Sequence, residues 1–421
     1  MIKVLKFGGA SVDSADAVRN VGNILKKYSS DKVLIVLSAM GKTTNAFEHI
    51  ADSYFNQMSS TFDLFQDVKN YHLSIANELF QESNHQVFQD LNHIFDDIES
   101  ALAESISDNF NYEYDRIVSF GEILSTTILY HYLLENKFLI AWSDARNMVE
   151  TNADFRNALV NWTASQSKIS EQCAGLFANN NFVISQGFIA RSTNGDTTTL
   201  GREGSDFSAA IFAYALDAER LVIWKDVPGL LNADPKYFEN TKKLDKVSFK
   251  ETIELAYYGA SIIHPKTIKP LQNKNIPLYI KSFIDPDSEG SIIQSNTIND
   301  QLIPSFIFKK SQVLISISPR DFSFIAESNL ARIFSQLANY GLKANLMQNS
   351  AISFSLCIDE AGENMIEFIQ EMQNDFKVRY NRNMELITIR HYNQEVIDEL
   401  IGNRKVYLEQ KSRSTVQLLV R

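Results

Sequence analysis

The first 37 residues alternate between strand-like and helix-like patterns, and this alternation constrains the fold most. Residues 2–7 are a short apolar run, residues 14–28 carry apolar side chains at helical spacing, and residues 32–37 (KVLIVL) are continuously apolar. A continuously apolar strand is typical of a sheet that is buried on both faces. Strand, helix and strand in close succession form a βαβ unit, so the sequence predicts an α/β fold around a mostly parallel sheet.

Further along the chain the same alternation continues. Residues 46–134 are mostly helical in pattern, and a helix is expected over 249–258, ended by Gly259. Four more short apolar runs predict buried strands, at residues 138–142, 182–185, 221–224 and 276–280.

After Pro304 the pattern changes, which predicts a domain boundary near residue 305. A β-α-β-β-α-β order is expected, resembling a ferredoxin-like domain, with strands at 306–318 and within 342–358 and 384–391, and helices at 324–338 and 363–376. A shortened second copy follows, with a helix at 395–401 and strands at 406–410 and 414–420. Since only Arg421 follows Val420, the last helix and strand of that copy are expected to be absent.

Composition narrows the class of protein. The net charge of −11 argues against nucleic acid as the main partner. The two cysteines, Cys173 and Cys357, give no disulfide framework and suit a reducing cytoplasm. The first residues look like a strand and not a signal peptide, and the apolar runs are too short to span a membrane. A cytoplasmic protein with no membrane partner is therefore expected.

A polar stretch at residues 197–206 (TTTLGREGSD) stands out, because it combines hydroxyls, two glycines, a guanidinium and two carboxylates. It leads into an alanine-rich helix, and the first N–H groups of a helix are a ready anion site. The simpler interpretation is a capped loop in which Ser205 or Asp206 is the N-cap.

Two other features of the sequence give weaker evidence about function. The fragment Gly41-Lys42-Thr43-Thr44 is not a nucleotide P-loop, because that motif needs a glycine where Val36 stands. It still follows a predicted parallel strand, where ligands bind in open sheets. Four histidines lack paired ligand spacing and are interpreted as structural: His49, His72, His85 and His93. No protein metal site is predicted.

Motifs spread over nearly the whole chain occur in a recognisable order. They are Lys6-Phe7-Gly8-Gly9, Leu37-Ser38-Ala39 with Thr44-Asn45, Gly121-Glu122, Thr198 to Asp206, Trp224 to Gly229 with Asp234-Pro235, and Tyr258-Gly259-Ala260 with His264-Pro265. Together they resemble the aspartate kinases of the amino-acid kinase superfamily. The resemblance implies a three-layer αβα sandwich as the catalytic domain (residues 1–305). It also implies an α+β ACT regulatory region (residues 306–421), with one full and one shortened unit.

The reaction that the resemblance implies is transfer of a phosphoryl group from ATP, with Mg²⁺, to the β-carboxylate of L-aspartate. It would be the first step of lysine, threonine and methionine biosynthesis. Because the acceptor is already an anion, no strong base is needed. Catalysis would consist of positioning, with cations and N–H donors on the transferring group.

The resemblance also implies roles for single residues. The catalytic residues would be Lys6, Gly8, Gly9 and Asp206. Those binding aspartate would be Ser38, Thr44, Glu122, Arg202, Ser205 and Asp206, with Arg202 clamping the α-carboxylate and Glu122 and Asp206 facing the ammonium group. Those binding the nucleotide would be Lys6, Gly9, Lys225, Asp226, Leu231, Asp234, Lys236 and Ser261.

The chain departs from the family pattern at three positions. Ala10 stands where a threonine is common, Ser261 where a lysine is common, and Leu231 where some members have tyrosine. Lys266, five residues after Ser261, is a candidate substitute for the missing lysine. These departures bear on nucleotide affinity more than on the type of reaction.

The ACT-like region suggests regulation. Asn345, Met347, Gln348 and Asn349 lie where an effector loop would be, and would hold lysine or threonine at a subunit interface. They could equally be polar residues joining strands. Since ACT units pair across subunits, a homodimer or higher homo-oligomer is expected. No dehydrogenase domain follows, so a monofunctional enzyme is expected.

Two alternatives stay open at this point. One is a related kinase acting on glutamate or a uridine nucleotide, against which the Arg202, Ser205 and Asp206 group and the ACT-like region argue. The other is a catalytically weak or silent amino-acid sensor, supported by Ser261 and Ala10 alone.

Overall fold

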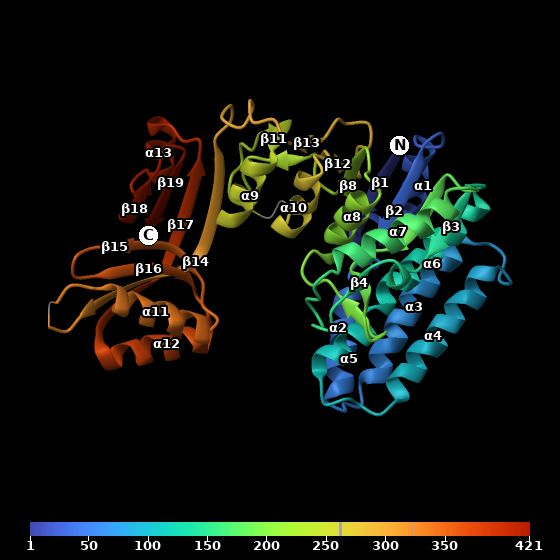
Figure 1. Cartoon of the computed structure of the whole chain (residues 1–421), viewed down its shortest axis with the longest axis horizontal. Coiled ribbons are helices and arrows are strands. Elements are labelled where there is room, and N and C mark those ends of the chain that lie inside the picture. Colours follow the sequence, from blue (N-terminus) through green and yellow to red (C-terminus); the bar gives the residue numbers. More distant parts are fainter. Residues whose placement is uncertain (261–262, 322) are drawn as a thin grey trace. The chain divides into compact units, whose positions relative to one another are not determined.

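The computed structural model describes residues 1–260, 263–321 and 323–421, which form two compact units (Figure 1). The first unit comprises residues 1–230, 243–253 and 262–297, and the second comprises 231–242, 254–261 and 298–421. The units are thus not continuous in sequence. The second begins its main part at residue 298 and takes two short segments from the part that the sequence analysis assigned to the catalytic domain.

The first unit is built on an eight-stranded sheet in the order β11-β13-β12-β8-β1-β2-β5-β3. Its strand pairs are parallel except β12 with β13, as a mostly parallel sheet requires. The bounds are β1 (Ile2–Phe7), β2 (Lys32–Leu37), β3 (Ile140–Ser143), β5 (Phe182–Gln186), β8 (Arg220–Lys225), β11 (Lys246–Ser248), β12 (Leu278–Ser282) and β13 (Ser291–Gln294). The predicted α/β class is confirmed.

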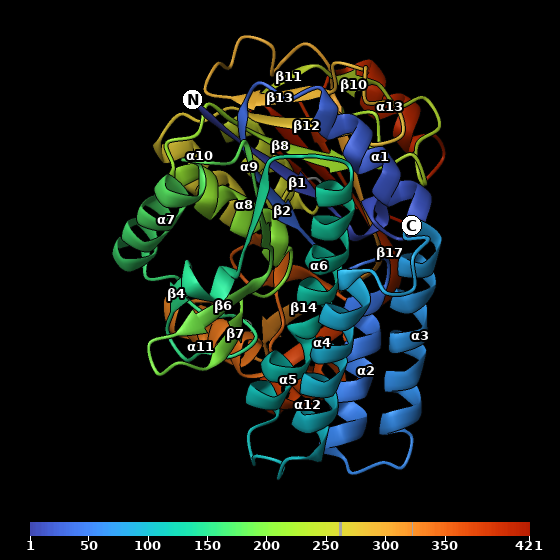
Figure 2. The same ribbon diagram turned by 90° about the vertical axis from the view of Figure 1, so that its right-hand side faces the viewer.

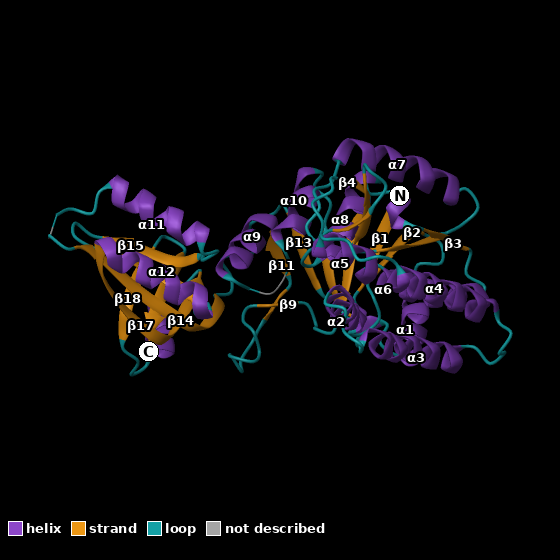
Figure 3. Cartoon of the chain, turned by 90° about the horizontal axis from the view of Figure 1, so that it is seen from below, coloured by secondary structure: helices purple, strands orange, loops and turns teal. Residues whose placement is uncertain are grey.

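Helices cover both faces of this sheet, which gives the three-layer arrangement (Figure 3). On one face lies α8 (Gly204–Ala215), packed against α7 (Trp162–Leu176) and α10 (Pro265–Asn273). On the other lie α1 (Ala15–Lys26) and α6 (Phe120–Glu135). Next to α6, the helices α2 (Thr43–Phe55), α3 (Thr61–Leu79) and α4 (Gln86–Ala103) run side by side, as Figure 2 shows.

The start of α8 differs from the sequence interpretation. Its N-cap is Glu203, in the left-handed region with φ of 54°, and no side chain caps the helix. The interpretation of Ser205 or Asp206 as the N-cap is therefore wrong. Both side chains lie in the first turn of the helix, where they are available to a site in front of it.

One stretch of the described residues, Phe110–Glu135, is long and apolar enough to cross a membrane by length and composition alone. It comprises α5 (Phe110–Val118) and α6, and 78% of its most apolar window is buried inside the structure. This stretch is a core element of the first unit, since α6 packs against β2, β3 and β5.

Short elements connect these layers. They are η1 (Gly9–Ser11), η2 (Ala145–Asn147), β4 (Glu150–Thr151), β6 (Ile189–Ser192), β7 (Thr197–Thr199), β9 (Leu230–Leu231), β10 (Lys243–Leu244) and α9 (Phe249–Tyr258). Strand β7 pairs with β6 and leads directly into the loop before α8.

The second unit is built on a six-stranded sheet in the order β15-β16-β14-β17-β19-β18. Its first half is β14 (Ser305–Pro319), α11 (Glu327–Asn339), β15 (Ala344–Asn349), β16 (Phe354–Asp359), α12 (Gly362–Asp375) and β17 (Phe376–Arg390). This is the predicted β-α-β-β-α-β order, folded around a core that contains Ile315, Leu356 and Phe368.

The second half reuses the same two long strands, followed by α13 (Gln394–Ile401), β18 (Val406–Lys411) and β19 (Thr415–Val420). Residues 305–309 of β14 pair with 386–390 of β17, whose other neighbour is β19. The position of the strand that was expected to be absent is therefore filled from an earlier part of the chain. Strand β17 also begins at Phe376 and not near 384, because residues 376–381 pair with β14.

Candidate active site

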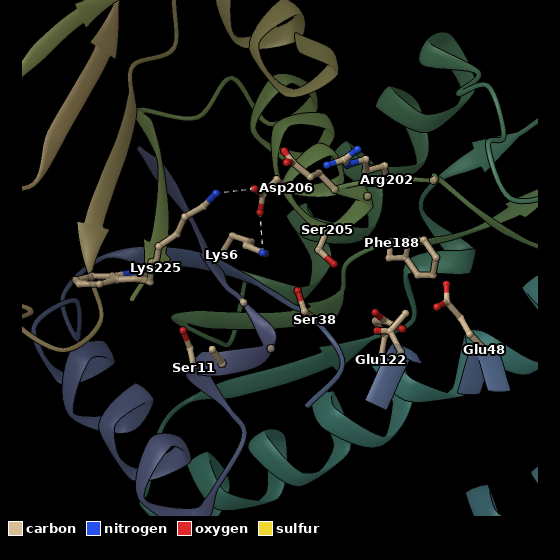
Figure 4. A pocket seen from close by; sticks show the side chains of 18 of the residues that line it. Lys6, Ser11, Ser38, Glu48, Glu122, Phe188, Arg202, Ser205, Asp206 and Lys225 are labelled. Carbon is tan, nitrogen blue, oxygen red and sulfur yellow. Dashed lines mark ion pairs between the residues drawn. The ribbon is translucent and has the colours of Figure 1, made fainter. Parts of the chain in front are cut away.

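A cavity of about 630 Å³, open to solvent, lies at the carboxyl ends of β1, β2 and β8 in the first unit (Figure 4). Residues of α2, α5, α6 and α8 complete its wall. The carboxyl edge of a parallel sheet is where ligands bind in open α/β folds. A volume of this size is typical of a small-molecule binding site.

Every residue predicted for catalysis or for aspartate binding lines this cavity: Lys6, Gly8, Gly9, Ser38, Thr44, Glu122, Arg202, Ser205 and Asp206. Of the residues predicted for nucleotide binding, four line it: Lys6, Gly9, Lys225 and Asp226. The fold thus gathers side chains from distant motifs into one space, although their individual roles stay predictions.

The centre of the cavity holds a cluster of opposite charges. The Asp206 carboxylate, which is 4% exposed, forms an ion pair with Lys6 Nζ at 2.7 Å through one oxygen and faces Lys225 Nζ at 3.7 Å through the other (Figure 4). Burial by itself raises the pKa of this carboxyl, but the two lysines outweigh it and lower the pKa below its usual value. Asp206 is therefore ionised, and it fixes the position of Lys6 at the end of β1.

The pKa of Glu122 is shifted in the opposite direction from that of Asp206. Glu122 is buried in the first turn of α6, and its Oε1 accepts the backbone N–H of Ala39 at 3.2 Å. Its Oε2 has no hydrogen-bond partner within the described parts of the chain. Burial raises the pKa of Glu122 to about 8, against the lowering effects of Ala39 and Lys6. A buried, unsatisfied carboxyl oxygen that faces a cavity is a site for a cationic or hydrogen-bonding ligand group.

Arg202 lies in a loop whose backbone is held from several sides. Gly201 has φ of 74° and Glu203 has φ of 54°, so the loop turns sharply on both sides of Arg202. The Glu203 Oε2 accepts the backbone N–H of His264 at 2.8 Å, which anchors the loop to α10. The Arg202 side chain is exposed on the wall of the cavity (Figure 4).

Gly9 is required by a close backbone approach. A Cβ at this position would lie 2.8 Å from the carbonyl oxygens of both Ala39 and Gly41, closer than real contacts allow. The loop after β1 thus packs directly on the loop after β2, which also brings the backbone of residues 8–11 to the cavity wall.

The other residues predicted for nucleotide binding lie elsewhere. Leu231, Asp234 and Lys236 belong to the second unit and are not among the residues that line the cavity. Ser261 lies outside the described residues. Lys266, the candidate substitute, bonds through Nζ to Asn157 Oδ1 and does not line the cavity either.

Several lining residues lie outside the motifs and were not found from sequence: Ser11, Glu48, Tyr114, Arg156 and Phe188. Glu203 and Trp224 also line the cavity, and they belong to motifs although no role was predicted for them. Two of the residues outside the motifs, Arg156 and Phe188, have φ of 67°, a conformation that is unusual for such residues and marks functional sites more often than others. Sequence alone carries no signal for that conformation.

Of the histidines interpreted as structural, His72 and His85 have such roles. His72 is buried against the Val68 carbonyl, at 2.7 Å from its Nδ1, and its burial lowers its pKa to about 4. His85 caps α4 by accepting the N–H of Val87. His49 and His93 are exposed on helices.

In the second unit, only one of the residues predicted for effector binding lines a small pocket. Asn345 lines it together with Tyr257, Tyr258, Lys309 and Lys343. Its side chain accepts Lys309 Nζ at 2.8 Å and donates to Gln312 and Asp359. Met347, Gln348 and Asn349 are exposed on the edge strand β15.

Comparison with known proteins gives the family of the chain. Residues 1–282 match the Amino acid kinase family, which covers most of the chain. A curated relative, the lysine-sensitive aspartokinase 3 of Escherichia coli, is 30% identical over 366 residues, spanning 86% of this chain and 79% of the relative. The chain therefore belongs to the amino acid kinase family, and within it to the aspartokinases.

Solved structures support the same assignment to the aspartokinases. The structure of E. coli aspartokinase III in complex with aspartate and ADP superposes with a TM-score of 0.81 at 26% identity, covering 100% of this chain and 96% of the other. The same enzyme in complex with lysine and aspartate gives a TM-score of 0.82 at 27% identity, with the same coverage. Both units of the present chain thus have counterparts in one related enzyme.

Proposed function

We propose that this protein is an aspartate kinase, which transfers the γ-phosphoryl group of ATP to the β-carboxylate of L-aspartate. The products are 4-phospho-L-aspartate and ADP. The observation that carries the proposal is the single cavity in which Lys6, fixed by the buried Asp206, lies together with Glu122 and Arg202. Membership of the aspartokinases supports the same assignment.

The chemistry needs no strong base. A β-carboxylate oxygen of aspartate forms a bond to the γ-phosphorus, while the bond from that phosphorus to the bridging oxygen of ADP breaks. Negative charge spreads over the transferring group, so the useful protein groups are fixed cations and N–H donors. Lys6 supplies a cation whose position is set by its 2.7 Å ion pair with Asp206, and backbone N–H groups of the loop after β1 lie on the same wall.

At the other side of the cavity, two groups suit the amino-acid end of the substrate. Glu122 has a buried oxygen available for the ammonium group, and Arg202 offers a planar fork for the α-carboxylate. The sequence analysis gave Asp206 a share in binding the ammonium group as well. Since two lysines occupy its carboxylate, we propose that Glu122 binds the ammonium and that Asp206 positions Lys6.

ATP would carry Mg²⁺ into the site. In the described residues, no group of three or more histidine, cysteine, aspartate or glutamate side chains is placed to hold a metal ion. This fits Mg²⁺, which keeps several waters and is commonly held by substrate phosphates with one or two carboxylates. Asp226, which lines the cavity next to Lys225 in sequence, would provide such a carboxylate. When bound, the ion would neutralise charge on the phosphates.

A coupled ADP-release assay tests the function directly, with hydroxylamine added to trap the acyl phosphate as a hydroxamate. L-Aspartate should give both signals, whereas L-glutamate, N-acetylglutamate and UMP should give neither. ADP release with one of those three substrates and not with aspartate would assign a different kinase. No release with any of them, together with measurable amino-acid binding, would favour the silent sensor.

We further propose that the second unit regulates the first. The ferredoxin-like order of elements in the second unit supports this proposal. Lysine is the first effector to test and threonine the second, because a related enzyme was solved with lysine. Inhibition curves with each amino acid and with both together test regulation. Light scattering at several concentrations tests the expected homodimer. The cytoplasmic location stays a prediction.

A further inference from the structure

Arg156 is a residue of the cavity wall that no motif predicted, and its backbone is unusual. It lies in the segment after β4 with φ of 67°, in the left-handed region that favours glycine. A non-glycine residue held there is under strain, and such residues cluster at functional sites. The surrounding contacts explain how the strain is maintained.

Its backbone is tied to the loop that carries Arg202. The Arg156 N–H donates to Asp115 Oδ2 at 2.9 Å, and the same buried carboxylate accepts the N–H of Thr199 at 2.8 Å and its hydroxyl at 2.6 Å. The carbonyl oxygen of Arg156 also packs against Gly201, where a Cβ would lie only 2.9 Å from it. Asp115 therefore sets the position of Arg156 relative to the loop after β7.

Its side chain rests on a fixed aromatic platform. The guanidinium lies 4.3 Å from the centroid of the Tyr114 ring and 5.6 Å from that of Phe110. The Tyr114 hydroxyl donates to Glu48 Oε1 at 2.5 Å, which holds the ring in place. Glu48 lies on the same side of the cavity as Glu122 and Phe188, away from Lys225 (Figure 4).

In the described part of the chain, Arg156 forms no ion pair, although burial raises the pKa of the Asp115 carboxyl and the charge of Arg156 lowers it against that larger effect. Arg19, Arg116, Arg146 and Arg220 of the same unit each form an ion pair. Across the described residues, the Arg156 side chain contacts the Phe110 and Tyr114 rings and the amide oxygen of Asn111. No carboxylate there lies within ion-pair distance of its guanidinium group. Arg202 likewise has no carboxylate partner there, and both arginines line the same cavity. Two guanidinium groups that line one cavity without an ion pair are suited to binding a carboxylate.

We propose that Arg156 is a second carboxylate-binding residue for the amino-acid substrate and acts beside Arg202. It attracts the α-carboxylate at the rim of the cavity, while the β-carboxylate faces Lys6. This inference rests on the proposed function for the identity of the ligand, an acidic amino acid. Because the residue is exposed, its contribution falls with ionic strength.

The positive φ gives a sharp test, because Arg156→Gly removes the side chain and suits the backbone. Calorimetric binding of L-aspartate to the full chain should weaken by about tenfold, with the Tm unchanged or higher. In the kinase assay, the KM for aspartate should rise by a similar factor, while the KM for ATP stays within about twofold. Arg156→Lys should keep part of the affinity, and Arg191→Ala, which changes an exposed arginine away from the cavity, should change neither constant.

Salt provides an independent readout. Raising NaCl from about 0.05 M to 0.3 M should weaken aspartate binding more in the wild type than in Arg156→Gly. Unchanged aspartate affinity in Arg156→Gly, or an equal loss for ATP, would overturn the inference. If the wild type binds aspartate but releases no ADP, the proposed function fails while the binding comparison still decides the role of Arg156.

Discussion

The two ends of the cavity differ in how their charges are balanced. Around Lys6, the protein supplies its own counter-charge, since Asp206 contacts both Lys6 and Lys225. At the amino-acid end, Glu122 keeps one buried oxygen without a partner, and Arg156 and Arg202 have no carboxylate partner in the described residues.

This difference suggests that one end of the cavity stabilises the transition state and the other recognises the ligand. A cation that must stabilise a short-lived transition state is useful only if it is already in place, so an internal ion pair is an advantage there. Groups that must recognise a ligand are more effective when the ligand itself supplies the missing partner. The following tests are ordered by the size of the expected effect.

The largest effect is expected at the end of the cavity where Lys6 is paired with Asp206. Lys6→Ala should lower kcat by about a thousandfold, close to 4 kcal/mol in transition-state stabilisation. The fold should persist, because Asp206 keeps Lys225 as a partner. Lys3→Ala is the matched control, since Lys3 lies on the same strand and pairs with Asp31 outside the cavity. Steady-state kinetics with circular dichroism would contradict the assignment if kcat stayed within about tenfold.

Arg202→Ala should weaken binding of the amino acid at the other end of the cavity. We expect the KM for aspartate to rise by about thirtyfold, near 2 kcal/mol, because a charged hydrogen-bonding group is lost. The KM for ATP should change by no more than about threefold. Equal increases in both constants would show that the loop acts on the whole cavity and not on the amino acid alone.

Glu122 provides a test through pH. Its folded-state pKa is about 8 against 4.5 for the free group, so between these values the folded state holds a proton that the unfolded state has lost. Stability should therefore fall as pH rises from 4.5 to 8 and level off above 8. The Glu122→Gln variant should lack this part of the slope.

Thermal unfolding of both proteins across that pH range measures the difference, which is at most a few kcal/mol, about 1.4 for each pKa unit. Binding of an ammonium group should ionise Glu122, so aspartate binding near neutral pH should release a proton. Calorimetry in buffers of different ionisation enthalpy detects that release. Parallel stability curves, together with no proton release, would remove Glu122 from its assigned role.

The smallest effect is expected for Lys266. Its amine bonds to Asn157 and does not line the cavity, so Lys266→Ala should change the KM for ATP by less than about twofold. A larger increase would mean that Lys266 does replace the lysine missing at Ser261. It would also show that the nucleotide end has a cation beyond Lys6 and Lys225.

Local patterns predicted the elements of the first unit well, because buried parallel strands are continuously apolar. The strand at residues 32–37 was located to the residue. In the second unit the start of β17 was missed, since its first residues are held by pairing with β14. The N-cap at Glu203 was missed for a related reason. The left-handed backbone of Glu203 is held by contacts with neighbouring segments, and a glutamate residue does not by itself predict that conformation.

The sequence by itself determined which residues could take part in the chemistry, through motifs whose order resembles one family. Only the tertiary structure decided how those residues are paired. Lys6 and Asp206 lie far apart in the sequence of the first unit, and their contact depends on β1 and α8 packing together. Tyr114 and Arg156 reach the same cavity with no motif at all. Electrostatic energies in a buried site depend on distances of a few ångströms, and those distances arise only when the layers of the fold are assembled.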